Sequence, residues 1–374
     1  MKNTPRSATN VGERARPFAM TLLLVTTGLS ITLAGARSVG DIIGPVFLAV
    51  VLTITLHPIR LRLERRNAPE WAASLVMVLA AVLLLFFLTL ALVVSVARLA
   101  DLLPQYSEQM ADTVQNAANT LRDLGVKQEQ IDAVSKAIDP SQLVAFAVSL
   151  LSGSLGVLTD LFFLITVLLF IAFDTDSTRR GLATVGERFP NPVAALNNFA
   201  KGSRSYMAVS AGFGLVVAVI DGVVLYFMGV PGAFVWAVLA FVTNFIPNIG
   251  FIIGVIPPAV IALLEGGPGL MIAVIVVYSV INFIIQSVIQ PRVVGDAVGL
   301  SGTLTFLSLV FWAWLIGPLG ALLAVPLTLF ARALLVEADP RARWALPLIS
   351  GQPEKDPELK PKAEPGPFKE EPVG

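Results

Sequence analysis

Apolar runs of about twenty residues, repeated along the chain, constrain the fold more than any other feature of this sequence. Because a helix rises about 1.5 Å per residue, a run of about twenty apolar residues can cross the hydrocarbon core of a bilayer. Such runs alternate here with short segments that carry most of the charge. They predict an all-α polytopic membrane protein with about eight transmembrane helices, over 18–35, 39–57, 71–97, 143–173, 205–229, 232–264, 269–290 and 302–336.

Composition supports the membrane assignment and excludes several kinds of chemistry. The chain is 55% hydrophobic and 14% charged, whereas soluble domains have about 25% charged residues. It has no cysteine, which rules out disulfides and thiolate sites, and its one histidine, His57, leaves little scope for zinc binding or a catalytic triad. His57 precedes Pro58 beside several arginines, so we interpret it as interfacial. The net charge is zero and suggests no nucleic-acid partner; no metal and no cofactor are expected.

The chain divides into membrane and extramembrane segments. Met110, Val114, Ala117 and Leu121 recur at helical spacing, which predicts amphipathic helices that either rest on the membrane domain or form a subunit contact. Residues 351–374 are rich in proline and charge and are typical of disorder. The expected organisation is a cytoplasmic segment 1–17, transmembrane helices in 18–97, an extracytoplasmic helical segment 98–142, further transmembrane helices in 143–336 with a cytoplasmic loop 174–204, and a disordered cytoplasmic tail 337–374.

The first apolar run resembles a secretory signal in part. Arg14 and Arg16 precede it, and it ends in Ala34-Gly35-Ala36, as a cleavage site does. The apolar core of a cleaved signal is usually only about 7–15 residues long, so we expect an uncleaved first helix.

The distribution of basic residues predicts the orientation. With the N-terminus inside, twenty of the 26 lysines and arginines fall on inner segments, as the positive-inside rule requires. Both termini are therefore expected in the cytoplasm, in a bacterial inner membrane. A hairpin at 232–264 that entered and left on one side would turn Arg332, Arg341 and Arg343 outward, so the charges favour one broken crossing there.

One apolar segment contains an unusual concentration of helix-breaking and polar residues. Irregular backbone at membrane depth is tolerated only where it packs in protein or lines a wet cavity, and proline lacks the N–H that a helix needs. Broken helices are where many transporters bind a solute or an ion, although a tolerated kink is the alternative. The candidate pathway residues are Asn244, Pro247, Asn248, Gly250, Gly254, Pro257 and Pro258.

Two neighbouring segments add to this candidate site. A second interruption lies in 302–336, and paired broken segments point to a transport site. Between the two interruptions, polar residues recur every three or four positions and so share one helix face, which either lines a pathway or makes interhelical hydrogen bonds. The residues are Gly317, Pro318 and Gly320 in the second interruption, and Ser279, Asn282, Gln286 and Gln290 in the polar stripe.

Two carboxylates fall within predicted spans, Asp160 and Asp221. An ionisable group at the centre of a membrane helix costs about 2.5–3.5 kcal/mol on insertion scales, so it usually has a function. We therefore interpret both as candidates for coupling transport to protons or other ions; the alternative is a neutral or paired structural group.

The broken segment and the region downstream of it resemble the AI-2E family of transporters. The motifs that carry the resemblance are Pro247-Asn248-Ile249-Gly250, Pro257-Pro258, Gly299-Leu300-Ser301, Gly317-Pro318-Leu319-Gly320 and Val325-Pro326-Leu327. The resemblance extends along the whole chain. It implies two short N-terminal crossings, a third followed by an outer helical segment, and five more. One branch of the family is associated with export of autoinducer-2, a small polar quorum-sensing molecule, and other branches with sodium–proton exchange. Some members are thought to be homo-oligomers.

The leading hypothesis is a secondary transporter that exports a small polar solute such as autoinducer-2. No G-x-x-x-x-G-K-[ST] phosphate-binding loop occurs in the sequence, so an ion gradient is the expected source of energy, with H⁺ or Na⁺ and membrane lipid as partners. The alternatives are a sodium(lithium)/proton antiporter and a membrane scaffold without transport. An enzyme is not expected, since its only support is the Asp174-Thr175-Asp176 sequence at a helix end.

Overall fold

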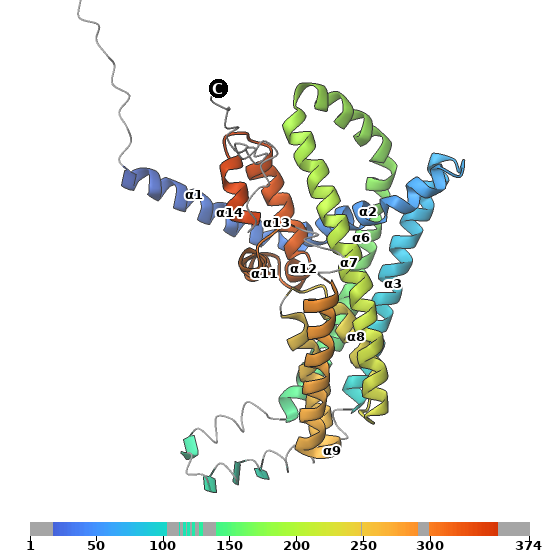
Figure 1. The fold of residues 1–374 in the computed structure, drawn as a ribbon, viewed down its shortest axis with the longest axis vertical. Coiled ribbons are helices and arrows are strands. Elements are labelled where there is room, and N and C mark those ends of the chain that lie inside the picture. The colour runs from blue at the N-terminus through green and yellow to red at the C-terminus, as the bar shows by residue number, and fades with distance from the viewer. Residues whose placement is uncertain are drawn as a thin grey trace, which may run out of the picture.

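The computed structural model describes residues 18–102, scattered positions between 112 and 129, and then 140–247, 249–290 and 299–350. All regular structure within these residues is helical (Figure 1). The helices are α1 (Phe18–Ser38), α2 (Gly40–Glu64), α3 (Glu70–Leu102), α6 (Pro140–Arg188), α7 (Pro190–Phe227), α8 (Ala233–Thr243), α9 (Gly250–Asn282), η2 (Phe283–Ile289), α11 (Gly302–Ile316), α12 (Pro318–Leu322), α13 (Ala324–Arg332), η3 (Ala333–Glu337), η4 (Arg343–Ala345) and α14 (Leu346–Ser350).

The helices have the lengths and surfaces of a membrane protein. Among the described residues, four helical stretches are long and apolar enough to cross a bilayer: Gly40–Glu64, Glu70–Ser95, Pro190–Phe227 and Gly250–Ile289, the last of which is interrupted at Gly267. The pair Leu161–Thr175 and Ser177–Arg188, bent by 56°, makes a fifth if it is counted as one span. Large apolar side chains point outward, and Phe162, Phe173 and Phe227 are at least 75% exposed, as expected where lipid is the solvent. The prediction of a polytopic helical protein therefore holds, whereas eight crossings are not found.

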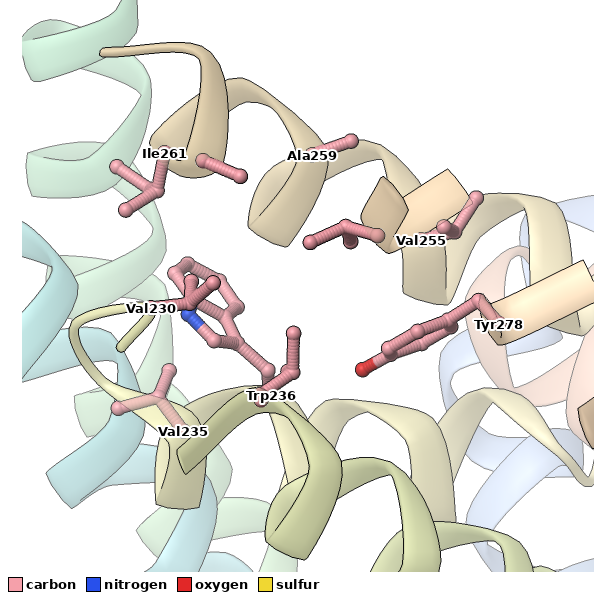
Figure 2. Close-up of a cluster of buried hydrophobic side chains, with 10 residues drawn as sticks. Val230, Val235, Trp236, Val255, Ala259, Ile261 and Tyr278 are labelled. Carbon is pink, nitrogen blue, oxygen red and sulfur yellow. The ribbon is translucent and has the colours of Figure 1, made fainter. Parts of the chain in front are cut away.

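The segment 232–264 is broken, as predicted, but it is not one crossing. Helix α8 ends at Thr243, and α9 begins at Gly250 and runs back along it. A Cβ atom at Gly250 would overlap the Thr243 carbonyl, and one at Gly254 would lie 3.8 Å from Cα of Ala240. Farther from the break, Trp236 packs in one cluster with Ile261 (Figure 2). These pairings show an antiparallel hairpin.

The hairpin has a simple physical cause. Helix α8 has 11 residues, a length of about 16 Å, so it reaches only about halfway through a bilayer. The turn at residues 244–249 then reverses the chain instead of continuing it. The expectation of a single broken crossing is therefore wrong.

Helix α9 contains a second reversal at Gly267, whose φ and ψ are 72° and −170°. This positive φ is readily adopted by glycine, and Pro268 starts the next helical stretch. Val274 and Tyr278, beyond the turn, pack in one buried cluster with Val255 and other residues before it. The α9 legs before and after Gly267 are thus antiparallel, and residues 268–289 extend about 33 Å, enough to cross a bilayer.

The segment 302–336 forms another hairpin, although we predicted a single crossing. Helix α11 ends at Ile316 and is followed by Gly317, whose φ is 75°, and the chain returns through α12 and α13. Trp312 Nε1 donates to Thr328 Oγ1 across the hairpin at 2.9 Å. At its open end, Arg332 Nη1 donates to the Gly299 carbonyl at 2.7 Å. Both ends of this hairpin therefore lie on the same side of the molecule.

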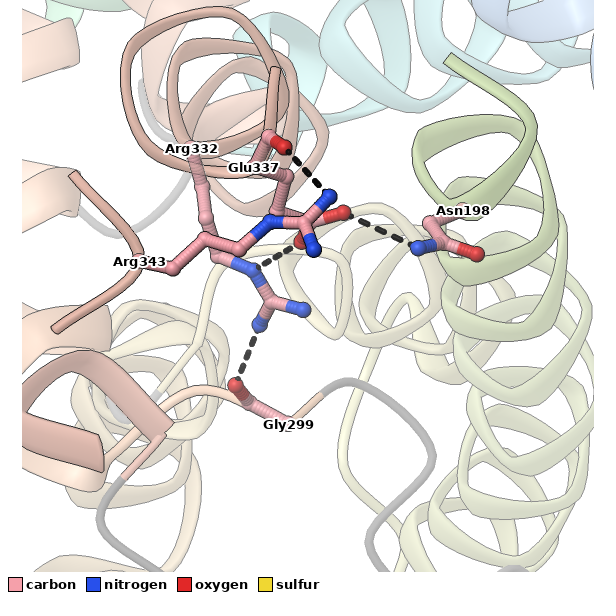
Figure 3. Close-up of polar contacts among 5 residues, drawn as sticks. All are labelled: Asn198, Gly299, Arg332, Glu337 and Arg343. Atoms are coloured by element: carbon pink, nitrogen blue, oxygen red, sulfur yellow. Dashed lines mark hydrogen bonds and ion pairs between the residues drawn. The ribbon is translucent and has the colours of Figure 1, made fainter. Parts of the chain in front are cut away.

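A polar cluster fixes the open end of this second hairpin to α7 (Figure 3). Glu337 is 8% exposed and its carboxylate accepts from Arg332 Nε at 2.6 Å and from Asn198 Nδ2 at 3.0 Å. Arg343 Nη2 also donates to the Glu337 carbonyl at 3.4 Å. Because Asn198 belongs to α7, the cluster holds the second hairpin against the first half of that helix.

Helix α7 packs against helices from both halves of the chain, α2 and α6 before it and α8, α9 and α13 after it. Near its N-terminal end, Phe199 contacts Phe47 of α2 and Phe330 of α13, with ring centroids 6.1 and 5.2 Å apart. One turn farther on, Arg204 Nε donates to the Ile54 carbonyl at 3.0 Å. That carbonyl lies four residues before Pro58, which has no N–H to bond it, so Arg204 satisfies a group that the proline leaves free.

Some segments that we predicted to be loop or disordered tail are helical, and others lie outside the residues that the structure describes. The predicted loop 174–204 is helical except at Phe189, because α6 extends to Arg188 and α7 starts at Pro190. The predicted disordered tail is ordered as far as residue 350, where Ser301 N donates to the Ile349 carbonyl at 3.0 Å. Residues 1–17 and 351–374 lie outside the described part. Most of 98–142 also lies outside the described part. Nearly all of the positions after 111 that the structure does describe in this segment are helical.

Candidate transport site

Asp221 is a fully buried charged side chain that lies beside the first hairpin. It lies on α7 and is 0% exposed. Neither carboxylate oxygen has a hydrogen-bond partner among the described residues. A buried carboxylate normally requires a compensating partner, so an unpartnered one marks Asp221 as a functional candidate.

A small cavity lies beside this carboxylate, between α7, α8 and both legs of α9. Its volume is about 10 Å³, which is room for about one water-sized particle. Tyr278 lines it from the second leg of α9, and its hydroxyl also has no partner among the described residues. The lining residues are Val217, Asp221, Ala240, Thr243, Asn244, Phe251, Gly254, Tyr278 and Asn282.

Three amide side chains connect the tip of the first hairpin to its surroundings. Asn244 Nδ2 donates to the Ser210 carbonyl of α7 at 3.0 Å. Gln286 Nε2, on the transmembrane leg, donates to Asn244 Oδ1 at 3.1 Å and to Asn282 Oδ1 at 2.9 Å. Asn282 Nδ2 in turn donates to the Tyr278 carbonyl at 2.9 Å. The tip is therefore held between two long helices by side-chain hydrogen bonds that can break without disrupting a helix.

The surroundings of the tip are shaped to receive it. Gly214 on α7 leaves space for Asn244, since a Cβ there would lie 2.8 Å from Asn244 Nδ2. The hydroxyl of Tyr206 donates to the Phe245 carbonyl at 2.9 Å, which satisfies a backbone group in the turn. Gln286 belongs to the π-helical stretch η2, and π-helical turns are frequent at functional sites.

The structure brings together some of the predicted pathway residues and separates others. Asp221, Asn244, Gly254 and Asn282 line one cavity, and Gln286 is bonded to two of them. Pro247, Gly250, Pro257 and Pro258 belong to the same hairpin, whereas Gln290 follows η2 and does not line the cavity. Gly317, Pro318 and Gly320 belong to the second hairpin. Asn248 and the side chain of Asp160 lie outside the described residues.

Two of the interruption glycines have a packing reason for being glycine. A Cβ at Gly250 would overlap the Thr243 carbonyl, and one at Gly320 would overlap the Trp312 carbonyl. Each glycine lets the two arms of one hairpin approach closely.

Sequence reasoning missed Tyr278 and Thr243. Tyr278 lies one helical turn before Asn282 and shares its face, so the polar stripe could have included it. Thr243 had no comparable signal, because its role depends on how the hairpin closes.

The two hairpins, the buried carboxylate of Asp221 and the amide side chains bonded beside it are typical of one class of molecule, the helical membrane transport protein, in which broken helices form the site. Comparison with known proteins gives the same class. Residues 21–338 match the model of the AI-2E family transporter. The chain belongs to this family, which comprises transport proteins and not enzymes.

Relatives cover nearly the whole chain. The AI-2 transport protein TqsA of Escherichia coli is 31% identical over 308 residues, which are 81% of this chain and 88% of TqsA. Two relatives bear the name "Putative transport protein". One, from Haemophilus influenzae, is 31% identical over 86% of this chain and 94% of its own length. The other, YhhT of Escherichia coli, is 29% identical over 89% of this chain and 95% of its own length.

Proposed function

We propose that this protein is a secondary transporter that exports a small polar solute such as autoinducer-2 across the bacterial inner membrane. The observation that carries the proposal is the polar cluster at the first hairpin tip, where Gln286 donates to both Asn244 and Asn282 beside the buried Asp221. Family membership supports transport, and the name of the relative TqsA supports the choice of solute.

The geometry supports a mechanism in which the first hairpin moves. A cavity of about 10 Å³ cannot hold a solute the size of a sugar, so a path requires the tip to leave its seat. The two interhelical bonds of Asn244, to Ser210 and to Gln286, would break in this step. Amide groups released in this way can bind the hydroxyls of a polar solute.

Energy would come from an ion gradient acting on Asp221. A carboxylate without a described partner can take up a proton from one side and release it to the other when the hairpin moves. Asp160, on α6, is the second candidate for this role. The proposed orientation puts both termini in the cytoplasm, so that the end of α7 that carries Lys201 and Arg204 faces inward.

The test is solute flux in proteoliposomes containing the purified full-length protein. Autoinducer-2 and related small polar solutes are supplied under imposed pH and sodium gradients. Gln286→Ala should weaken the apparent affinity for the solute, since Gln286 bonds two residues of the site. Gln290→Ala is the matched control, because Gln290 lies about one turn away and does not line the cavity. Absence of protein-dependent flux for every solute in the panel would refute the proposal.

A further inference from the structure

We infer that a cluster of arginines where α2, α6 and α7 meet binds a phosphate group, at the depth where the head groups of phospholipids lie. The cluster is centred on His57 of α2. Three guanidinium groups lie close enough to His57 to act on it electrostatically, those of Arg60, Arg179 and Arg204. Among the described residues, Glu64 is the one carboxylate that does so. The three arginines belong to α2, α6 and α7 in turn, and these helices contact one another.

The cluster carries more positive charge than its one carboxylate can neutralise. Arg60 is only 2% exposed, and its Nε bonds Glu64 Oε1 at 2.6 Å. Arg204 is partly buried and donates to the backbone carbonyl of Ile54, and it has no carboxylate partner within the described part of the chain. Three guanidinium groups and one carboxylate leave two positive charges in excess. Because buried charge is costly unless it is paired, an anion bound in the cluster would stabilise the packing of the three helices.

The hydrogen-bond donors that remain suit a phosphate group. The Nδ1 atom of His57 is buried and has no hydrogen-bond partner among the described residues, and an imidazole nitrogen can donate to an anionic oxygen. Arg204 uses its Nε for the Ile54 carbonyl, which leaves the two Nη groups of its guanidinium to donate elsewhere. Guanidinium groups bind phosphate through such paired donors. His57 and Arg60 are three residues apart and so share one face of α2.

The depth of the cluster favours a phospholipid as the source of the phosphate. Helix α2 ends at Glu64, and the exposed Trp71 follows near the start of α3; tryptophan is enriched at the membrane–water interface. On α6, the exposed Phe173 is followed at once by Asp174, which marks the edge of the apolar surface. Arg179 is exposed and lies fewer than two helical turns beyond this edge. Basic pockets between transmembrane helices at this depth bind the head groups of anionic lipids.

Thermal unfolding of the purified, detergent-solubilised full-length protein tests the inference. The unfolding midpoint is followed as phosphatidylglycerol, cardiolipin or zwitterionic phosphatidylcholine is added, and separately as sodium phosphate replaces sodium chloride at constant ionic strength. A ligand that binds only the folded state raises the midpoint in a saturable manner. We expect a saturable rise with the two anionic lipids and none with phosphatidylcholine. A rise with inorganic phosphate and none with lipid would support the site and assign it to free phosphate. No rise with anionic lipid or phosphate, or an equal rise with all three lipids, would overturn the inference.

Two neighbouring arginines provide matched variants. Arg179 and Arg180 are both exposed, and of the two only Arg179 acts on His57. Arg179→Gln should weaken the apparent affinity for the anionic lipid by about tenfold, because a charge-assisted hydrogen bond is lost, whereas Arg180→Gln should leave it unchanged. The titrations are made in high salt, which screens general attraction to exposed charges. An equal loss of affinity in both variants would show attraction to a basic surface and refute a defined site.

Arg204 gives a second, independent pair of variants. Arg204→Gln should also weaken the apparent affinity by about tenfold, and Arg204→Lys by less, because lysine keeps the charge and loses the paired donors. If Arg204→Gln fails to fold, the comparison of Arg179→Gln with Arg180→Gln decides. An unchanged affinity in Arg179→Gln and in a folded Arg204→Gln would refute the site. Because none of these arginines lines the cavity beside Asp221, the result does not depend on the proposed transport function.

Discussion

Asn244 holds the tip of the first hairpin, and its contribution can be measured. Its amide donates to the Ser210 carbonyl at 3.0 Å and accepts from Gln286 at 3.1 Å. Interhelical hydrogen bonds in membrane proteins contribute about 0.6 kcal/mol each on average and about 1.7 kcal/mol at most. Asn244→Ala removes both bonds, so we expect it to lower the free energy of unfolding by about 1 kcal/mol, roughly a fivefold change in the equilibrium.

A double-mutant cycle isolates the bond across the hairpin. Only the Asn244–Gln286 bond is lost in both Asn244→Ala and Gln286→Ala, so the coupling energy should be about 0.6 kcal/mol. The free energy of unfolding is measured for the unmutated protein, the two single variants and the double variant. Unfolding is induced by SDS in mixed micelles and followed by the fluorescence of buried Trp236 and the other tryptophans. In the control cycle, Asn198→Ala replaces Gln286→Ala; Asn198 bonds Glu337 at the second hairpin and should be additive with Asn244. Additivity of the Asn244–Gln286 pair to within about 0.3 kcal/mol would refute the interpretation that this bond holds the tip.

Three further predictions concern topology, packing and coupling. A membrane-impermeant thiol reagent added outside cells should label Gln115→Cys and not Arg65→Cys, and the reverse pattern would contradict the proposed orientation. Gly250→Ala should destabilise the protein by about 1–3 kcal/mol because its Cβ would overlap the Thr243 carbonyl, whereas Gly212→Ala, which has open space, should not; thermal unfolding compares the two. Asp221→Asn cannot titrate, so proteoliposomes should lose proton-driven accumulation of solute and keep downhill exchange; accumulation with an unchanged pH profile would make the carboxylate structural.

The sequence predicted the helices well because their signal is local. An apolar run and its flanking charges lie within one stretch of chain, so the positions of α2, α3 and the C-terminal part of α7 could be found without knowledge of the tertiary structure. The break near Pro247 could be predicted for the same reason, because proline loses its N–H wherever it occurs. The polar residues of the site were also visible, since Asn282 and Gln286 have helical spacing.

The direction of the chain after each break could not be predicted. A turn that reverses the chain and a kink that continues it use the same residues, proline, glycine and asparagine. What separates them is packing between segments: Gly250 against Thr243 in the first hairpin, and Gly320 against Trp312 in the second. Such contacts have no periodicity along the sequence. For the same reason Thr243, which lines the cavity only because the hairpin closes, was not a candidate.

The two hairpins also explain why the charge count pointed to a single crossing at 232–264. A hairpin there changes which side of the membrane the following segments reach, and a lone hairpin would send Arg332 to the side opposite Arg204. The second hairpin restores the original side, because it also begins and ends at one end of the bundle. Arg332 thus bonds Glu337 beside Asn198 of α7, near the end where Arg204 bonds α2. Arg204 and Arg332 therefore lie at one end of the bundle, as the charge count assumed, and that this end faces the cytoplasm stays a prediction. The error lay in the count of crossings, since two re-entrant segments have the same effect on the far end of the chain as two full crossings.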